Sequence, residues 1–433
     1  METILKFFKN YWHISIFLFG LFPRLVYSLF HYYDGVFERF ADDKHYLAFG
    51  QAVANQGPFV KDISNLTEPF VGPFLPWILG IEIKLFGPEW LYIFVVNSIV
   101  GAIFPLLIYY YFREFFSNTV SFISAIWISL SPMYIHFTPT AGKDLLICYF
   151  NLLLVLSFLK LIKNTSTNNI IFFSFSIAGS FFVDERFLIF TPFFILFFLL
   201  SGETSLNRKL KTMTISIFII CLIHLPWLIR NFQVYDRFVL VTERADGLIE
   251  LLVENEDDNV IDRSYNKFYL SPAQIDEVIK GERNRYPSGG MIRPEKIDFI
   301  KKGNIPYEFS YFRNCISNFW AFWKPFDFSI EFVEGGYKLN ENWSIIHNLS
   351  SILFYGILLP FFIFGTFLFR KNKNILIICS FIYYSALLHT FIVPATVSRY
   401  RVPIDFLLTL VAFMTIHHLI NQKKIKLPLY LSF

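Results

Sequence analysis

The sequence predicts an all-α polytopic membrane protein with about ten transmembrane helices. Of its 433 residues, 55% are hydrophobic and 17% are charged, whereas a soluble domain usually carries about 25% charged residues. Apolar runs of about 18 residues or more recur along the chain, and each can cross a hydrocarbon layer of about 30 Å as a helix. Lysine and arginine gather in alternate connections between these runs, which is typical of a chain that crosses a bilayer repeatedly.

The predicted spans follow the apolar runs in order. We place them at residues 11–31, 90–112, 118–136, 141–162, 169–183, 187–201, 212–230, 344–369, 374–393 and 401–421. The first run contains Arg24, lacks a small-residue cleavage site and is followed by many further spans. It therefore indicates a signal-anchor helix rather than a signal peptide that is removed.

The basic residues set the orientation. With the N-terminus in the cytoplasm, every short inner connection carries lysine or arginine, as the positive-inside rule requires. These residues are Lys6, Lys9, Arg113, Lys160, Lys163, Arg208, Lys209, Lys211, Arg370, Lys371, Lys373, Lys423, Lys424 and Lys426. We therefore expect a bacterial inner (plasma) membrane protein with both termini in the cytoplasm. The net charge of +4 reflects this topology, and no nucleic-acid partner is expected.

Two polar regions then lie outside, at residues 32–71 and 231–343. The chain divides into an N-terminal membrane region (1–230) that includes the first external loop, a long extracytoplasmic loop (231–343) and a C-terminal membrane region (344–433). We expect interfacial helices in the first loop and amphipathic helices in the long one. The external side also receives the turns at 136–143, 184–186 and 394–400.

Two segments fit the span pattern poorly. Residues 72–87 are short for a span and contain Glu82 and Lys84, so we interpret them as an interfacial or re-entrant helix. Residues 184–186 read Asp-Glu-Arg, and burying them inside one long helix would cost about 3 kcal/mol for each charge. A short hairpin with these charges at its outer turn costs less. Ionisable groups at such a depth are functional candidates.

The first external loop begins a helix with the acidic pair Asp42 and Asp43, followed by Tyr46 at helical spacing. The pair has two possible roles: it caps the helix, or it supplies a catalytic carboxylate that takes a proton from an acceptor. Lys143 and Asp144 begin a later helix and leave the same choice open.

The external turn near the C-terminus contains Arg399, Tyr400 and Arg401. Two guanidinium groups at this level suit a phosphate anion, and the alternatives are contact with lipid headgroups or pairing with the acidic 184–186 turn. Arg230 ends a span, where an arginine can simply extend its charge to the interface. The sequence contains no nucleotide-binding loop, zinc-protease motif or serine-hydrolase motif, and no ligand set for a metal.

Taken in order, these motifs resemble the polyprenyl-phosphate-sugar-dependent glycosyltransferases of the GT-C membrane fold, which include protein O-mannosyltransferases and aminoarabinose transferases. The resemblance rests on the acidic pair four residues before Tyr46 and on a run of later motifs. These are NQGPF, PFVGPFLPWILGIEIKLFG, LSPMYIHFTPTAGKDLL, PWLIRNF and SRYRVPIDF.

The resemblance implies an inverting transfer from a polyprenyl-phosphate-linked sugar to a lipid, glycan or protein acceptor. Asp42 would be the general base and Asp43 its neighbour. Substrate-binding positions would be Tyr46, Lys143, Asp144, Asp184, Glu185, Arg186, Arg230, Arg399, Tyr400 and Arg401. The family usually has Glu where Lys143 stands. No cofactor is expected, and a divalent metal is not required if guanidinium groups neutralise the phosphate.

Two other classes remain open: a lipid-linked sugar flippase or other transporter without transferase chemistry, and a polymerase or ligase of the O-antigen type. Transporters more often show inverted repeats and polar residues through the depth of several spans. Here the candidate charges gather on one face, which favours the transferase.

Overall fold

The computed structural model describes residues 11–35, 37, 43–62, 72–201, 205–236, 238–241, 280–281, 315–316, 318–325, 341–391 and 398–422. Asp42 and most of the long loop lie outside these residues, as do the first and last of the basic clusters that set the orientation. Within this part of the chain there are helices and turns but no strand.

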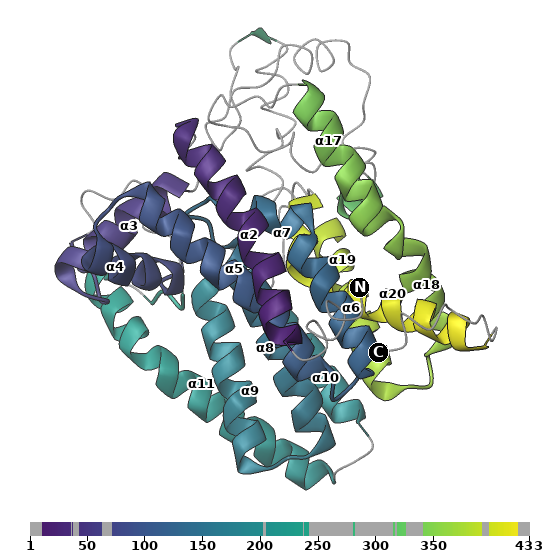
Figure 1. Ribbon diagram of the computed structural model, residues 1–433. Coiled ribbons are helices and arrows are strands. Elements are labelled where there is room, and N and C mark those ends of the chain that lie inside the picture. The colour runs from purple at the N-terminus through teal and green to yellow at the C-terminus, as the bar shows by residue number, and fades with distance from the viewer. Residues whose placement is uncertain are drawn as a thin grey trace. The chain divides into compact units, whose positions relative to one another are not determined.

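The helices follow the order of the predicted spans (Figure 1). They are α2 (Trp12–Tyr33), α3 (Asp43–Gln56), α4 (Phe74–Phe86), α5 (Trp90–Phe112), α6 (Asn118–Leu130), α7 (Pro132–His136), α8 (Asp144–Lys163), α9 (Thr167–Val183), α10 (Phe187–Leu200), α11 (Leu206–Tyr235), α17 (Glu341–Ser351), α18 (Leu358–Leu368), α19 (Lys373–Phe391) and α20 (Val402–Gln422). A π-helical turn (Ile352–Gly356) joins α17 to α18, and a 3₁₀ turn (Ser398–Tyr400) precedes α20.

Length and composition confirm a polytopic membrane protein. Seven helical stretches of the described chain are long and apolar enough to cross a bilayer: α2, α5, α8, α11, α19, α20 and the continuous stretch Asn348–Leu368. Three shorter apolar helices, α6, α9 and α10, occupy the positions of the other predicted spans. The stretch predicted at 118–136 divides at Ser131, because Pro132 starts a new helix and the residue before a proline avoids helical backbone angles.

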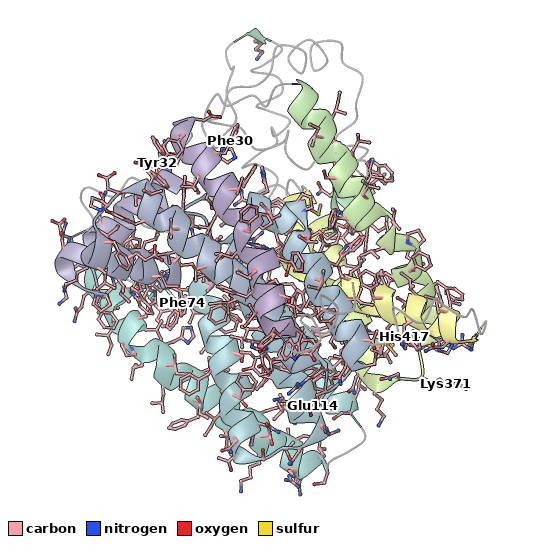
Figure 2. The ribbon with its side chains drawn as sticks, viewed as in Figure 1. Phe30, Tyr32, Phe74, Glu114, Lys371 and His417 are labelled. Atoms are coloured by element: carbon pink, nitrogen blue, oxygen red, sulfur yellow. The ribbon has the colours of Figure 1, made fainter. Side chains whose placement is uncertain are left out.

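Phenylalanine fills much of the interior. Between α8, α10 and α19 the ring centroid of Phe194 lies 4.8 Å from that of Phe158 and 5.7 Å from that of Phe381. Other aromatic side chains, such as Phe30, project from the helices instead (Figure 2). Phe74 packs edge-on against Phe150. The high phenylalanine content thus serves both the core and the apolar surroundings that a membrane provides.

The chain forms two compact units. The large unit contains Met1–Thr242, Pro325–Ile382 and Val402–Phe433, and the small unit contains Glu243–Lys324 and Tyr383–Arg401. The predicted division at 230 and 343 stays a prediction. Each unit is described by itself below.

Helix α4 forms where an interfacial or re-entrant helix was predicted, and it packs closely against α3. The close approach depends on glycine. A Cβ added to Gly80 would lie 2.5 Å from Cγ1 of Val53 and 3.2 Å from the carbonyl oxygen of Gly50. The contact between the two helices therefore helps to fix the position of Asp43, the first residue of α3.

Replacing Gly80 with Val is expected to lower the stability of the protein by about 1–3 kcal/mol, because the added methyl groups must displace α3. The measurement is thermal unfolding of the full chain in detergent, followed by tryptophan fluorescence. The control is Ile81→Val, which changes an exposed neighbour on the same helix. Equal unfolding temperatures for the two variants would show that the α3–α4 contact tolerates a side chain at Gly80.

Candidate functional site

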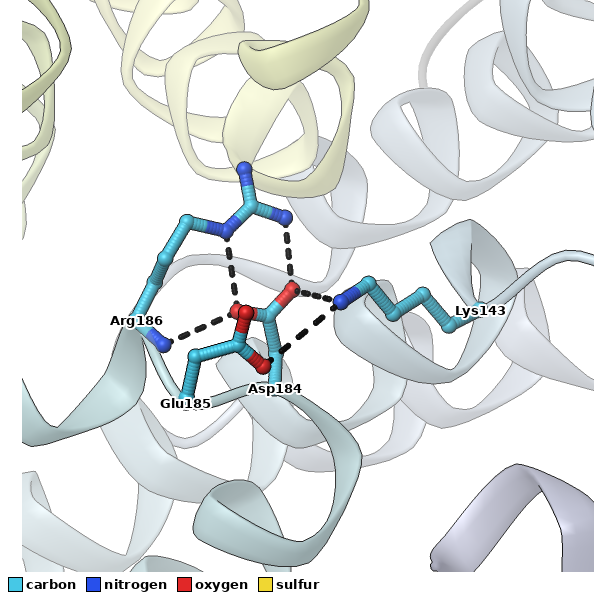
Figure 3. A network of polar contacts seen from close by, with 4 residues as sticks. All are labelled: Lys143, Asp184, Glu185 and Arg186. Atoms are coloured by element: carbon cyan, nitrogen blue, oxygen red, sulfur yellow. Dashed lines mark hydrogen bonds and ion pairs between the residues drawn. The ribbon is translucent and has the colours of Figure 1, made fainter. Parts of the chain in front are cut away.

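Four charged side chains from two distant connections meet in the large unit (Figure 3). Lys143 comes from the loop before α8, and Asp184, Glu185 and Arg186 form the turn between α9 and α10. The Nζ atom of Lys143 lies 2.9 Å from Oδ2 of Asp184 and 3.9 Å from Oε2 of Glu185. The turn predicted at 184–186 is therefore observed, and Lys143 is the cation that balances it.

Asp184 is the centre of this network. Its Oδ1 accepts hydrogen bonds of 2.9 Å from the backbone N–H and from Nε of Arg186, and its Oδ2 accepts one of 2.6 Å from Nη2. The backbone contact fixes the start of α10, whose first N–H groups have no partner inside the helix. The two-pronged contact from the guanidinium holds the Arg186 side chain over the turn.

The charges persist although the network is buried. Burial alone would lower the pKa of Lys143, but the nearby Asp184 and Glu185 carboxylates outweigh it and raise that pKa above its ordinary value. Burial would likewise raise the pKa of Asp184, but Arg186 and Lys143 hold it well below its ordinary value. Both groups are therefore ionised at neutral pH.

The acid of the first loop reaches the same region. Asp43 is fully buried at the start of α3. A Cβ added to Gly142 would lie 3.4 Å from Oδ1 of Asp43 and 3.4 Å from Oδ2 of Asp144, so both carboxylates face this glycine. Tyr46, one turn into α3, is buried in the region of Lys143. The structure thus joins the two connections and the first loop in one place.

We call this set the polar cluster. Its members are Asp43, Tyr46, Lys143, Asp144, Asp184, Glu185 and Arg186. All of them were predicted as site residues, and the structure brings them together.

Apolar and aromatic residues pack around the cluster. Tyr46 and Phe49 of α3 belong to a core with Leu79, Phe182 and Trp227. This packing comes from helices α3, α4, α9 and α11, so four elements fix the position of the cluster. Such a support is what a site needs if its side chains are to keep one geometry.

Arg230 lies near the end of α11 and contacts neutral groups rather than charges. Its Nε donates to the carbonyl oxygen of Val60 at 2.6 Å, its Nη1 donates to Asn231, and its guanidinium lies 4.7 Å from the ring of Trp227. Asn231 in turn donates to the carbonyl oxygen of Val239. Arg230 therefore ties the end of the first loop to the start of the long one, and its predicted contact with a phosphate stays a prediction.

The remaining predicted residues lie in the small unit. Arg401 is fully buried, and its Nη1 donates to the carbonyl oxygens of Phe322 and Lys324. Tyr400 packs its ring 5.2 Å from that of His389, and Arg399 is half-buried. Sequence reasoning passed over Lys324 and His389, both buried here, because each stands alone among apolar residues without a polar pattern.

Three or more histidine, cysteine, aspartate or glutamate side chains are nowhere close enough to hold a metal ion within the described ranges. The expectation that the reaction requires no divalent metal stays a prediction.

Part of the chain matches a known protein family. Residues 68–229 match the family model described as dolichyl-phosphate-mannose-protein mannosyltransferase. The matched stretch contains Lys143, Asp144 and the 184–186 turn but not the acidic pair. A search of curated proteins finds no match.

The fold matches solved membrane enzymes. The oligosaccharyltransferase AglB from Archaeoglobus fulgidus, in complex with an inhibitory peptide and a dolichol-phosphate, aligns with a TM-score of 0.55 and 16% identity over 96% of this chain and 51% of that chain. An Archaeoglobus fulgidus oligosaccharyltransferase in the apo form aligns with a TM-score of 0.53 and 15% identity over the same shares. ArnT from Cupriavidus metallidurans aligns with a TM-score of 0.41 and 12% identity over 95% of this chain and 78% of that chain.

The chain spans about half the length of AglB. At this low identity the likeness shows a common fold. Together with the family match, it confirms the resemblance to glycosyltransferases of the GT-C membrane fold that the motifs indicated.

Proposed function

We propose that this protein transfers a sugar from a polyprenyl-phosphate carrier to an acceptor at the extracytoplasmic face of the membrane. The observation that carries the proposal is the polar cluster, in which the first-loop acid Asp43 meets Asp144 and the Lys143–Asp184–Arg186 network at one end of a membrane helix bundle. The family description names a dolichyl-phosphate sugar, and the AglB complex contains a dolichol-phosphate. A lipid-linked donor suits a site at this level, because its carrier stays in the bilayer.

The acidic pair supplies the base. An acceptor hydroxyl or amine attacks the anomeric carbon, and Asp42 or Asp43 takes the proton as the new bond forms. The bond between the anomeric carbon and the phosphate oxygen breaks, and polyprenyl phosphate leaves with the electron pair. Attack opposite the leaving phosphate inverts the anomeric configuration.

Cations stabilise the departing phosphate. In the polar cluster the side chain of Arg186 is 26% exposed, so its guanidinium combines a position fixed by Asp184 with access for a ligand. Arg230, Arg399 and Arg401 remain candidates for the same task.

The distribution of buried charge favours a transferase over a transporter. The charge in the middle of α2, Arg24, donates from Nη1 to the carbonyl oxygens of Gly20 and Ser129. Arg24 therefore serves helix packing, whereas the carboxylates that could do chemistry gather at one end of the bundle. A translocation path would need polar groups along its whole depth.

The proposal is tested with the full chain in membrane vesicles and radiolabelled polyprenyl-phosphate mannose. We expect label to leave the carrier fraction and enter a glycolipid, glycan or protein fraction only when the protein is present. Release of polyprenyl phosphate should accompany it. Movement of intact donor between leaflets, without release of the carrier phosphate, would instead establish the flippase.

A further inference from the structure

The two acids of the 184–186 turn differ in how far their acceptor capacity is used. Asp184 accepts three hydrogen bonds from Arg186 and lies 2.9 Å from the ammonium of Lys143. Glu185 lies 3.9 Å from the same ammonium, beyond hydrogen-bond distance. Within the described chain no other side chain donates to Glu185.

This difference is physically costly unless something else binds Glu185. Its side chain is 9% exposed. Withdrawing a carboxylate from water costs free energy unless hydrogen bonds replace those that water made. Asp184 makes the short contacts with both cations of the network, so Glu185 adds the second negative charge without a short contact of its own. Asp184 also accepts from the backbone N–H of Arg186 at the start of α10, a contact in which the Glu185 side chain takes no part.

Lys143 keeps donor capacity beside it. An ammonium group has three N–H donors, and Asp184 takes one of them at 2.9 Å. Glu185 and Lys143 therefore place an anionic acceptor and a cationic donor next to each other (Figure 3). A carbohydrate hydroxyl fits this pair. It can donate a hydrogen bond to the carboxylate, while the same hydroxyl or a neighbouring one accepts a hydrogen bond from the ammonium.

We propose that Glu185, together with Lys143, binds hydroxyl groups of a carbohydrate substrate and so contributes to sugar specificity. The proposal rests on the proposed function for the identity of the substrate class. The hydroxyls belong either to the transferred sugar or to an acceptor glycan, and the chemistry is the same for both.

The test compares wild type with Glu185→Gln, using polyprenyl-phosphate mannose and its monodeoxy analogues. Loss of a hydrogen bond to a charged group should raise the KM for the sugar that contacts Glu185 by about 10- to 100-fold. If that sugar belongs to the donor, one deoxy analogue should have a KM raised by a similar factor with wild type. With the variant its KM should hardly differ from that of the unmodified donor. If it belongs to the acceptor, the KM for acceptor rises and the response to donor analogues stays that of wild type. Glu89→Gln, at an exposed carboxylate, is the matched control.

A separate readout keeps this inference distinct from the proposed function. Binding of polyprenyl-phosphate mannose and of bare polyprenyl phosphate is measured on the purified protein in detergent. If wild type transfers no sugar, the proposed function fails, and the inference then stands only if Glu185→Gln abolishes a preference for the sugar-bearing carrier. Unchanged KM values and an unchanged preference would overturn it, as would a fall in unfolding temperature large enough to show that Glu185 is structural.

Discussion

Replacing Asp43 with Asn is expected to slow sugar transfer by about 10²- to 10⁴-fold, the contribution typical of a positioned acid or base. Asp43 is fully buried and shares the space around Gly142 with the carboxylate of Asp144. The amide has the same shape but cannot take a proton. Because the side chain keeps its size and polarity, the amount of folded protein should stay nearly unchanged.

The assay is transfer of label from polyprenyl-phosphate mannose in vesicles with matched amounts of protein. Asp34→Asn, which changes an exposed carboxylate just after α2, is the control and should transfer at the wild-type rate. Wild-type transfer by Asp43→Asn would remove this residue from the chemistry. The parallel variant Asp42→Asn is expected to lose transfer as well. The pH dependence separates their roles, because the variant that lacks the base loses the acidic limb of the rate profile.

The sequence predicted the helices well because the bilayer imposes a simple rule. A span needs a long apolar run, and basic residues mark the connections. That rule recovered α5 with its observed ends, and it placed a hairpin at 184–186, since three adjacent charges would not lie inside a span. It erred at Ser131, where a proline divides one predicted span into α6 and α7.

The partners of the charges could not be predicted in the same way. Lys143 and Asp184 are 41 positions apart, and they meet because α8 and α9 pack side by side with opposite directions. The sequence could place both at one end of the bundle but not in one ion pair. The partners of Arg401 could not be predicted at all. They are the backbone carbonyl oxygens of Phe322 and Lys324, and every residue type carries such an oxygen.

Asp184→Asn is expected to destabilise the protein by about 3–5 kcal/mol, because breaking a buried ion pair leaves its partner charges uncompensated. Here the partners are Lys143 and Arg186. Thermal unfolding in detergent at pH 7 measures the loss. Glu114→Gln breaks the exposed pair with Lys163 and should cost only about 0–1 kcal/mol. A similar small loss in both variants would show that the buried network contributes no more than a surface pair.

The dependence on pH gives this prediction a second, independent check. The pKa of Asp184 is held below its ordinary value of 3.8 by Arg186 and Lys143 against the effect of burial. Its stabilisation is therefore complete above that value and declines as the pH falls further, because protons then bind the unfolded chain first. The difference in unfolding temperature between wild type and Asp184→Asn should be constant from about pH 5 upward and shrink below about pH 4. A difference that does not change with pH would mean that Asn disturbs the packing of the turn rather than its charge.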